Sequence, residues 1–149
     1  MFRTAVVGFV VAGAFLLVPV TAEAATGGCP KTVGQADEFT HSHKLFMPYK
    51  DGVHLGTKKH PYGWVTGRYA KEVPAKFDDY TWKPYGTKKT LYFAKKERTC
   101  AITTGTGSLW KSISLASFRK YEAKAGGTRT FGFSTSHGKV TKMVEVFHP

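Results

Sequence analysis

The amino-acid sequence predicts an all-β fold: a small antiparallel sandwich or barrel with one disulfide and at most one short helix. Short runs rich in aromatic and β-branched residues alternate with glycine-containing or polar turns, which is typical of such folds. The 149 residues are enough for a single domain, and two cysteines exclude a disulfide-dense scaffold. A hydrophobic content of 42% excludes both a disordered polycation and a protein with several membrane spans.

The first 24 residues have the pattern of a secretory signal peptide. Arg3 supplies a basic start, residues 5–20 are apolar or glycine, and Ala22-Glu23-Ala24 is a small-x-small cleavage site. A membrane anchor is the alternative, but this apolar run is shorter than the roughly 20 residues needed to cross a bilayer. The sequence therefore predicts a signal peptide over 1–24 and a secreted domain over 25–149, extracellular or associated with the cell wall.

The mature chain contains two cysteines, Cys29 and Cys100. In an oxidising compartment they are the only possible partners within the chain, so we expect a disulfide between them. Two free thiols or a bridge between two chains are the alternatives. Closing this long loop is expected to stabilise the fold by about 4 kcal/mol.

A β-hairpin is predicted in the middle of the chain. Residues 87–94 and 99–104 are rich in aromatic and β-branched residues, and the residues 95–98 between them are polar. Further strands are predicted where apolar residues alternate or where glycine disfavours a helix. These are residues 62–70, 109–117, 128–134 and 140–147.

Residues 117–125 fit either a short helix or a strand or loop. Phe118, Tyr121 and Ala125 are near helical spacing, and Gly126-Gly127 would end a helix in the normal way. We expect a strand or loop there. Residues 30–61 are rich in Gly, His, Lys and Thr and have no clear pattern of either kind.

Three short motifs follow one another in and around the predicted hairpin: Gly86-Thr87, Leu91-Tyr92-Phe93 and Cys100-Ala101-Ile102-Thr103. Together with Cys29 soon after the signal peptide, they resemble the spore-associated protein A family of secreted actinobacterial proteins. The resemblance implies a secreted β-domain and supplies no catalytic residues. The chain departs from the family pattern because it lacks a further cysteine pair near the C-terminus and because residues 30–85 have no counterpart.

The formal charge of +12 is concentrated in the second half of the chain. Residues 25–80 have a net charge of +2 and residues 81–149 have one of +10. Five basic residues cluster on and around the predicted hairpin: Lys88, Lys89, Lys95, Lys96 and Arg98. We expect them to bind an anionic polymer, such as a cell-wall polymer, an acidic polysaccharide or nucleic acid. The alternative is that these residues only keep strand edges soluble.

Aromatic residues are frequent just before this basic cluster. Tyr80, Trp82 and Tyr85 lie in a segment that resembles a loop, so we expect them to be exposed contacts for sugar rings or bases. Trp64 and Phe93 are expected in the core.

No cofactor is expected. Two histidines are candidate metal ligands, but the sequence does not complete a metal site around them. His41-Ser42-His43 on an extended segment would place both imidazoles on one face, where Asp37 or His54 could join them. No pattern fixes a third and a fourth ligand.

Four residues near the C-terminus are candidate catalytic groups, but their spacing does not favour a common active site. A ribonuclease needs a general acid, a general base and a cation that stabilises phosphate, and Glu145, His148, His137 and Arg129 have these chemical types. Glu145 and His148 are three residues apart, so they would face opposite ways on a regular strand.

The sequence therefore predicts a basic, secreted, non-enzymatic β-domain that binds an anionic surface polymer. A small secreted hydrolase or toxin, such as a ribonuclease, is the first alternative. A secreted enzyme inhibitor is the second.

Overall fold

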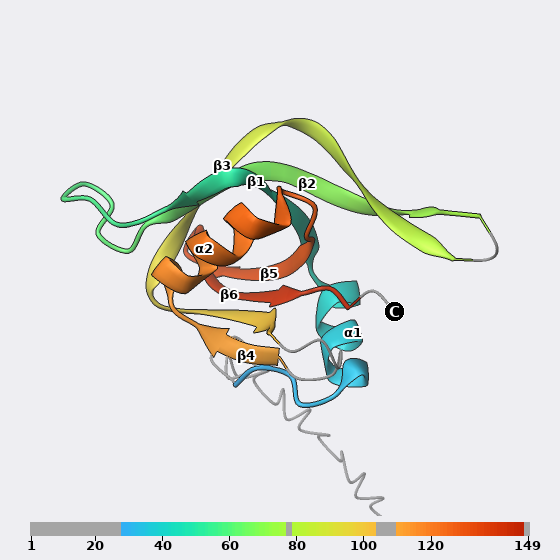
Figure 1. Cartoon of the computed structure of the whole chain (residues 1–149). Coiled ribbons are helices and arrows are strands. Elements are labelled where there is room, and N and C mark those ends of the chain that lie inside the picture. Colours follow the sequence, from blue (N-terminus) through green and yellow to red (C-terminus); the bar gives the residue numbers. More distant parts are fainter. Residues whose placement is uncertain (1–27, 77–78, 104–109, 148–149) are drawn as a thin grey trace, which may run out of the picture.

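The computed structural model describes residues 28–76, 79–103 and 110–147. They form one sheet of six strands accompanied by two helices (Figure 1). The strands are β1 (Lys44–His54), β2 (Trp64–Pro74), β3 (Tyr80–Ile102), β4 (Trp110–Ile113), β5 (Phe131–Ser136) and β6 (Lys139–Glu145). The helices are α1 (Val33–Ser42) and α2 (Leu115–Ala125). The all-β prediction with one disulfide is confirmed.

The sheet closes into a barrel because β3 pairs with different strands along its length. From Tyr80 to Tyr92 it is antiparallel to β2, and from Phe93 onward it pairs with β6 and β4. The ring β1–β2–β3–β6–β5 then returns to β1, with β4 outside it on β3. The expectation of an antiparallel sheet is wrong for one pair, since β3 and β6 are parallel. The chain between them contains β4, α2 and β5, which provide the crossover that a parallel pair needs.

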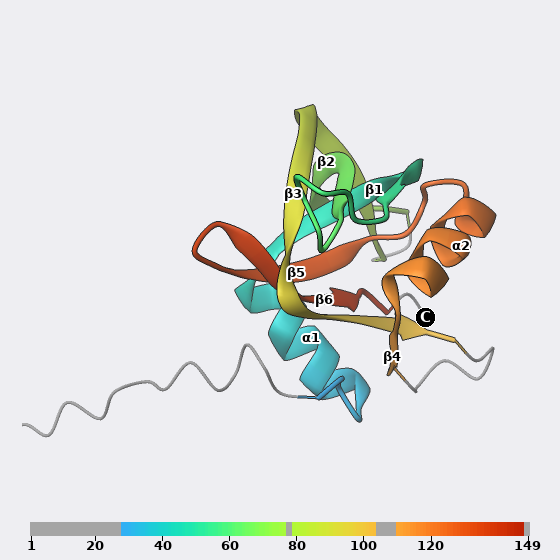
Figure 2. The ribbon, with the colours of Figure 1, turned by 90° about the vertical axis from the view of Figure 1, so that its left-hand side faces the viewer.

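The predicted hairpin over residues 87–104 is wrong, because both of its arms belong to the single strand β3. The polar residues 95–98 coincide with a shift in register between Phe93 and Arg98 relative to β6. An irregularity of this kind bends a strand. These residues therefore mark the bend at which β3 leaves β2, as Figure 2 also shows.

The segment of Tyr80, Trp82 and Tyr85 is likewise not a loop. It begins β3 and pairs with β2, from Tyr80 opposite Pro74 to Tyr85 opposite Tyr69. The true hairpins of the barrel are β2–β3 and β5–β6.

The sheet is accompanied by two helices, one more than the single short helix that the sequence allowed. In α1, Thr32 accepts a hydrogen bond from the Gln35 backbone N–H, and Gln35 Oε1 accepts one from the Lys31 N–H. This arrangement is close to a capping box. Ala36 and Thr40, four residues apart, form its buried side.

The expectation of a strand or loop over residues 117–125 is wrong. Ser114 caps α2 by accepting a hydrogen bond from the Ser117 N–H. Gly126 ends it with a φ of 70°, a conformation that glycine adopts without steric cost. Phe118 and Glu122 lie on the buried face, one turn apart.

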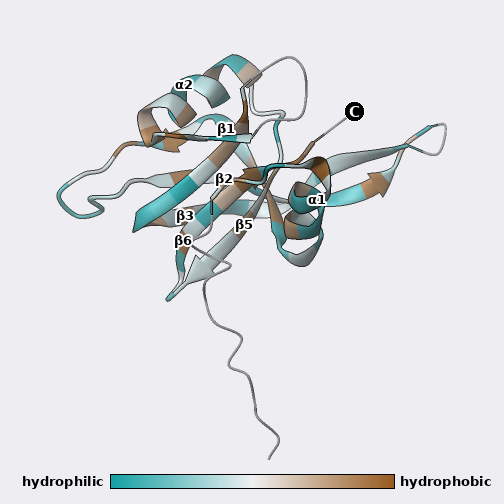
Figure 3. Cartoon of the chain, turned by 90° about the horizontal axis from the view of Figure 1, so that it is seen from below, coloured by the Kyte–Doolittle hydropathy of each residue, from teal (hydrophilic) through white to brown (hydrophobic). Residues whose placement is uncertain are grey.

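The main core fills the barrel beneath α2. Its fully buried residues include Phe46, Val65, Phe93 and Met143, and Phe118 of α2 packs edge to face against Phe131 with ring centroids 5.2 Å apart. Figure 3 shows hydrophobic and hydrophilic residues interspersed along the strands, as a sheet buried on one face requires. Phe93 is in the core as predicted.

Trp64 is only partly buried, so its expected place in the core is wrong. It stacks on His54 with ring centroids 4.9 Å apart. Its cross-strand neighbour on β3 is the exposed residue Tyr92, which places both on the outer face of the barrel.

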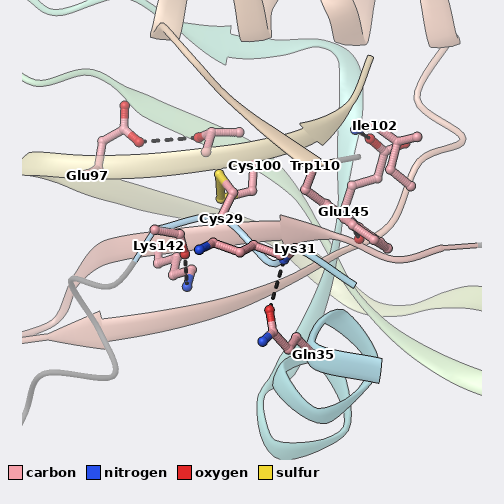
Figure 4. Close-up of a disulfide and its surroundings, with 11 residues drawn as sticks. Cys29, Lys31, Gln35, Glu97, Cys100, Ile102, Trp110, Lys142 and Glu145 are labelled. Carbon is pink, nitrogen blue, oxygen red and sulfur yellow. Dashed lines mark hydrogen bonds between the residues drawn. A yellow bond between two sulfur atoms is a disulfide. The ribbon is translucent and has the colours of Figure 1, made fainter. Parts of the chain in front are cut away.

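The predicted Cys29–Cys100 disulfide is confirmed, with Cα atoms 5.5 Å apart (Figure 4). It ties the segment before α1 to the second half of β3, beside the buried residues Ala36, Trp110 and Val144. The predicted signal peptide lies outside the described residues. Among those residues, neither helix is long and apolar enough to cross a membrane.

Candidate polyanion-binding groove

Three hollows adjoin one another on the barrel, and we refer to them together as the groove. The first, of about 330 Å³, lies between residues 59–63 of the β1–β2 connection and the turn 137–138 of the β5–β6 hairpin. The second, of about 480 Å³, shares Gly138 with the first. The third, of about 500 Å³, shares Ser42 and His43 with the second. Each hollow thus shares lining residues with the next.

Aromatic side chains form the floor of the second hollow. Tyr69 of β2 and Phe133 of β5 have ring centroids 6.2 Å apart and ring planes within 6° of parallel. Lys44 Nζ lies 5.6 Å from the Tyr69 ring centroid, in a cation–π contact. Leu91 of β3 also lines this hollow and packs against the main core. The floor is therefore held rigidly by the barrel itself.

The first hollow combines aromatic rings with two ammonium groups. The His60 ring stacks on the Tyr92 ring with centroids 4.4 Å apart. Tyr62 and Tyr92 each keep 37% of their surface exposed, so a ligand can reach them. Lys59 comes from the β1–β2 connection and Lys139 from the start of β6, so two separate parts of the chain supply positive charge to one hollow.

Lys142, which lines the third hollow, has a structural role. Its Nζ donates a 2.9 Å hydrogen bond to the Gly28 carbonyl and lies 5.1 Å from the Phe39 ring centroid (Figure 4). Burial, and after it the nearby Arg98 charge, lowers the pKa of Lys142. This lysine holds the N-terminal segment against β6 and is less available to a ligand than the exposed lysines of the groove.

The electrostatic character of the groove is positive. Lys44, Lys59 and Lys139 are exposed. Among the described residues, no carboxylate lines the first two hollows, and Glu38 is the one acidic residue that lines the third. Concave surfaces lined by one sign of charge concentrate ligands of the opposite sign.

The basic residues predicted to bind the polymer are spread along β3 and do not line the groove. Lys88 and Lys89 are neighbours on an exposed part of the strand, with Lys89 opposite Gly67 of β2. Lys95 and Lys96 lie at the bend. Arg98 of β3 is the cross-strand partner of Lys142 on β6. They contribute to the overall positive field, but they do not form one patch.

The predicted aromatic contacts lie on opposite faces of the β2–β3 hairpin. Tyr85 is paired with Tyr69, whereas Trp82, three positions away, is paired with Glu72 on the other face. Trp82 lines a separate hollow of about 220 Å³ next to α1, together with Asp37, His41 and Glu72. Tyr80 is 52% exposed at the start of β3. Tyr85 therefore does not share a face with Tyr80 and Trp82.

Of the candidate catalytic residues that the structure describes, Glu145 and Arg129 lie together and His137 lies apart from them. Glu145 accepts hydrogen bonds from the Ile102 N–H at 2.7 Å and from the Tyr121 hydroxyl at 2.8 Å, and its carboxylate lies 3.5 Å from Arg129 Nε. Burial raises the pKa of Glu145, and these hydrogen bonds and the Arg129 charge oppose the rise. His137 lies at the opposite end of the β5–β6 hairpin.

The remaining candidate, His148, lies outside the described residues. Glu145 is buried and Arg129 stacks on Tyr121 with its guanidinium carbon 3.3 Å from the ring centroid. Together they form an internal polar network, and a substrate cannot reach a carboxylate in that position.

The two histidines proposed as metal ligands are not on an extended segment. His41 is in the last turn of α1 and His43 follows the helix as its C-cap. Their Nδ1 atoms lie 2.8 Å and 2.6 Å from the backbone carbonyls of Asp37 and Phe39. The two residues line different hollows, and His54 stacks on Trp64 elsewhere. In the described parts of the chain, no group of three or more His, Cys, Asp or Glu residues is arranged to hold a metal ion.

These features define a class of protein: a basic β-barrel with one disulfide and a cationic, aromatic groove. Comparison of the chain with protein-family models, curated proteins and solved structures finds no match. The resemblance to the spore-associated protein A family therefore remains an expectation, and any function has to be argued from the groove.

Sequence reasoning missed the groove because its residues come from separate segments of the chain. The described lining residues that carry its chemistry are Phe39, His43, Lys44, Lys59, His60, Tyr62, Tyr69, Tyr92, Phe133, His137 and Lys139. No local run of charge marks them. The high number of histidines in the chain was one available signal, and three of the five described histidines line the groove.

Proposed function

We propose that this chain is a secreted, non-enzymatic domain that binds a linear anionic glycan of the cell surface, bearing phosphate or carboxylate groups, through the groove. The supporting observation is that three adjoining hollows carry exposed lysines and aromatic rings but almost no acid. The ammonium groups of Lys44, Lys59 and Lys139 would contact the anionic groups. Tyr62, Tyr92 and the other rings would contact the faces of sugars.

The architecture is consistent with this proposal. Five-stranded Greek-key barrels include the OB-fold, which binds oligonucleotides and oligosaccharides on its second and third strands and in the loops between strands 1 and 2 and strands 4 and 5. The groove involves the corresponding elements of this barrel: β2, β3, the β1–β2 connection and the β5–β6 turn. An architecture by itself does not determine a function, so the side chains of the groove remain the basis of the proposal.

The proposal is tested with three variants that remove the same amount of charge. The groove variant is Lys44→Gln/Lys59→Gln/Lys139→Gln. The matched control, Lys111→Gln/Lys120→Gln/Lys124→Gln, changes exposed lysines on β4 and α2. A third variant, Lys88→Gln/Lys89→Gln/Lys95→Gln, tests the basic residues of β3. Each folded variant is titrated with heparin, with purified cell-wall polymer and with a single-stranded oligonucleotide at several salt concentrations.

We expect the groove variant to bind the glycans at least about tenfold more weakly and to show a shallower salt dependence, because fewer counterions are released. The matched control should change affinity by less than about threefold, through the overall field alone. Equal loss in all three variants would contradict a specific groove. If the oligonucleotide binds clearly more tightly than the glycans, the ligand is a nucleic acid and the glycan proposal is wrong. Degradation of a polymer by the protein would contradict a non-enzymatic role.

A further inference from the structure

Three histidines line the groove, and each comes from a different element. His60 belongs to the β1–β2 connection and His137 to the β5–β6 turn, and both line the first hollow. His43 follows α1 and lines the second and third hollows. Histidine is the side chain whose charge ordinarily changes between about pH 5 and pH 8. The groove therefore holds groups that can change its charge over its full length.

The first hollow, which His60 and His137 line, contains lysines and tyrosines as its other titratable groups. The neighbouring titratable residues are Lys59 and Lys139, together with the phenols of Tyr62 and Tyr92. Among the described residues there, no carboxylate would compensate a new positive charge. An added proton thus increases the attraction of the hollow for an anion.

The backbone of His137 is a second, independent observation. Its φ of 51° makes it the only non-glycine residue with a positive φ in the described part of the chain. Glycine or asparagine commonly occupies such a position in a two-residue hairpin turn, and Gly138 follows here. The turn conformation itself does not require the imidazole of His137, which lies at the edge of the groove.

His43 is oriented by two contacts on one side of its ring. Its Nδ1 lies 2.6 Å from the Phe39 carbonyl, so this nitrogen carries the proton and donates the hydrogen bond. The ring also stacks on Phe39 with centroids 4.0 Å apart. The unprotonated nitrogen of the neutral ring is therefore Nε2. The charged groups that line the same hollows are Lys44, Lys142 and Glu38.

We infer that the groove is a pH-dependent binding site, in which protonation of His43, His60 and His137 strengthens the binding of the anionic polymer in mildly acidic surroundings. This inference rests on the proposed function. The three exposed lysines of the groove supply three positive charges: Lys44, Lys59 and Lys139. Protonation of the three histidines would raise the number of positive charges to six. The salt dependence of binding should rise with the charge, because more counterions are released.

The test measures heparin binding at pH 7.5 and pH 5.5 at fixed ionic strength. Heparin is chosen because its sulfate groups keep their charge over this range. For the unaltered chain we expect at least about a tenfold gain in affinity at pH 5.5 and a steeper salt dependence. The variant His43→Gln/His60→Gln/His137→Gln should lose most of the gain, so that its affinities at pH 5.5 and pH 7.5 differ by less than about threefold, whatever its affinity at pH 7.5.

The control variant His41→Gln/His54→Gln changes two histidines that do not line the groove and should keep the full pH dependence. Circular dichroism and thermal unfolding at both pH values verify that each variant is folded. Equal affinity at the two pH values, or a pH dependence that survives in the triple histidine variant, would overturn the inference and leave the proposed function standing. Absence of binding by the unaltered chain at both pH values would instead overturn the proposed function.

Discussion

The Tyr121 hydroxyl lies 2.8 Å from the Glu145 carboxylate, which connects α2 to the end of β6. The same hydroxyl lies 2.6 Å from the Ile102 carbonyl of β3. Arg129 stacks on the Tyr121 ring and forms an ion pair with Glu145. One phenol thus links the helix to two parallel strands, at a point where the sequence suggested catalytic groups.

Replacing Tyr121 by Phe should lower the free energy of unfolding by about 1–3 kcal/mol, because the single phenol O–H that the buried Glu145 carboxylate and the Ile102 carbonyl share as a donor is lost. Urea unfolding at pH 6 measures the change. Tyr80→Phe is the matched control, since Tyr80 is 52% exposed and should change stability by less than about 0.5 kcal/mol. Equal stability of the Tyr121→Phe variant and the unaltered chain would show that the network contributes nothing.

Glu122 of α2 should make the protein less stable as the pH rises. It is fully buried, and neither carboxylate oxygen has a hydrogen-bond partner among the described residues. Burial raises the pKa of Glu122 to about 8; the Arg129 charge opposes the rise and the Glu145 charge adds to it. The unfolded chain ionises this group near its ordinary value of 4.5. Between these values the folded chain binds more protons, so the free energy of unfolding falls as the pH rises from about 4.5 to about 8.

The variant Glu122→Met removes this titration while keeping an unbranched side chain of similar length. Urea unfolding at pH 5, 7 and 8.5 should give a smaller loss of stability with pH than in the unaltered chain. At pH 8.5 the variant should be the more stable of the two, since no buried charge remains uncompensated. Identical pH profiles would show that Glu122 does not titrate in this range.

Loss of the disulfide should lower stability strongly. The bridge closes a loop across a sequence separation of 71 residues, and the chain-entropy model assigns such a loop about 4 kcal/mol. Cys29→Ala/Cys100→Ala is compared with the oxidised chain by urea unfolding, after mass spectrometry has verified that the oxidised chain is lighter by two protons. A change below about 1 kcal/mol would indicate that the reduced chain is already constrained by other contacts.

Two glycines should respond oppositely to alanine. A Cβ at Gly67 of β2 would lie 2.2 Å from the Met47 carbonyl oxygen and 2.8 Å from the Phe46 ring. The Gly67→Ala substitution must therefore displace the backbone, and it should destabilise the fold by more than about 2 kcal/mol. A Cβ at Gly34 of α1 would meet nothing within 4 Å, and Gly34→Ala should raise stability by about 0.5 kcal/mol. Thermal unfolding of both variants measures the contrast, and a destabilised Gly34→Ala variant would contradict it.

Part of the fold could be predicted because it depends on local chemistry. The β-rich runs became strands, and Cys29 and Cys100 had no other partner within the chain. The missed helix α1 had a local signal in Thr32 and Gln35, whose spacing is that of a capping box. In α2, Ser114 and Gly126 are a normal cap and stop, which outweigh the strand-like pattern of residues 109–117. The prediction of a strand up to residue 117 is therefore wrong, since β4 ends at Ile113.

The groove could not be predicted in the same way. The lysines of residues 88–98 attracted attention because they are close in sequence, yet adjacent residues on a strand point to opposite faces. Lys44, Lys59 and Lys139 are far apart in sequence and line adjoining hollows only because the barrel closes.

The sequence alone determined the β-rich composition, the excess of positive charge and the pair of cysteines that form the disulfide. Each of these follows from residue types or from neighbours along the chain. Only the tertiary structure decided that β3 bends at residues 95–98, exchanging β2 for β6 and closing the ring. That pairing depends on contacts between residues far apart in sequence, and the same contacts decide which lysines, histidines and aromatic rings share one groove.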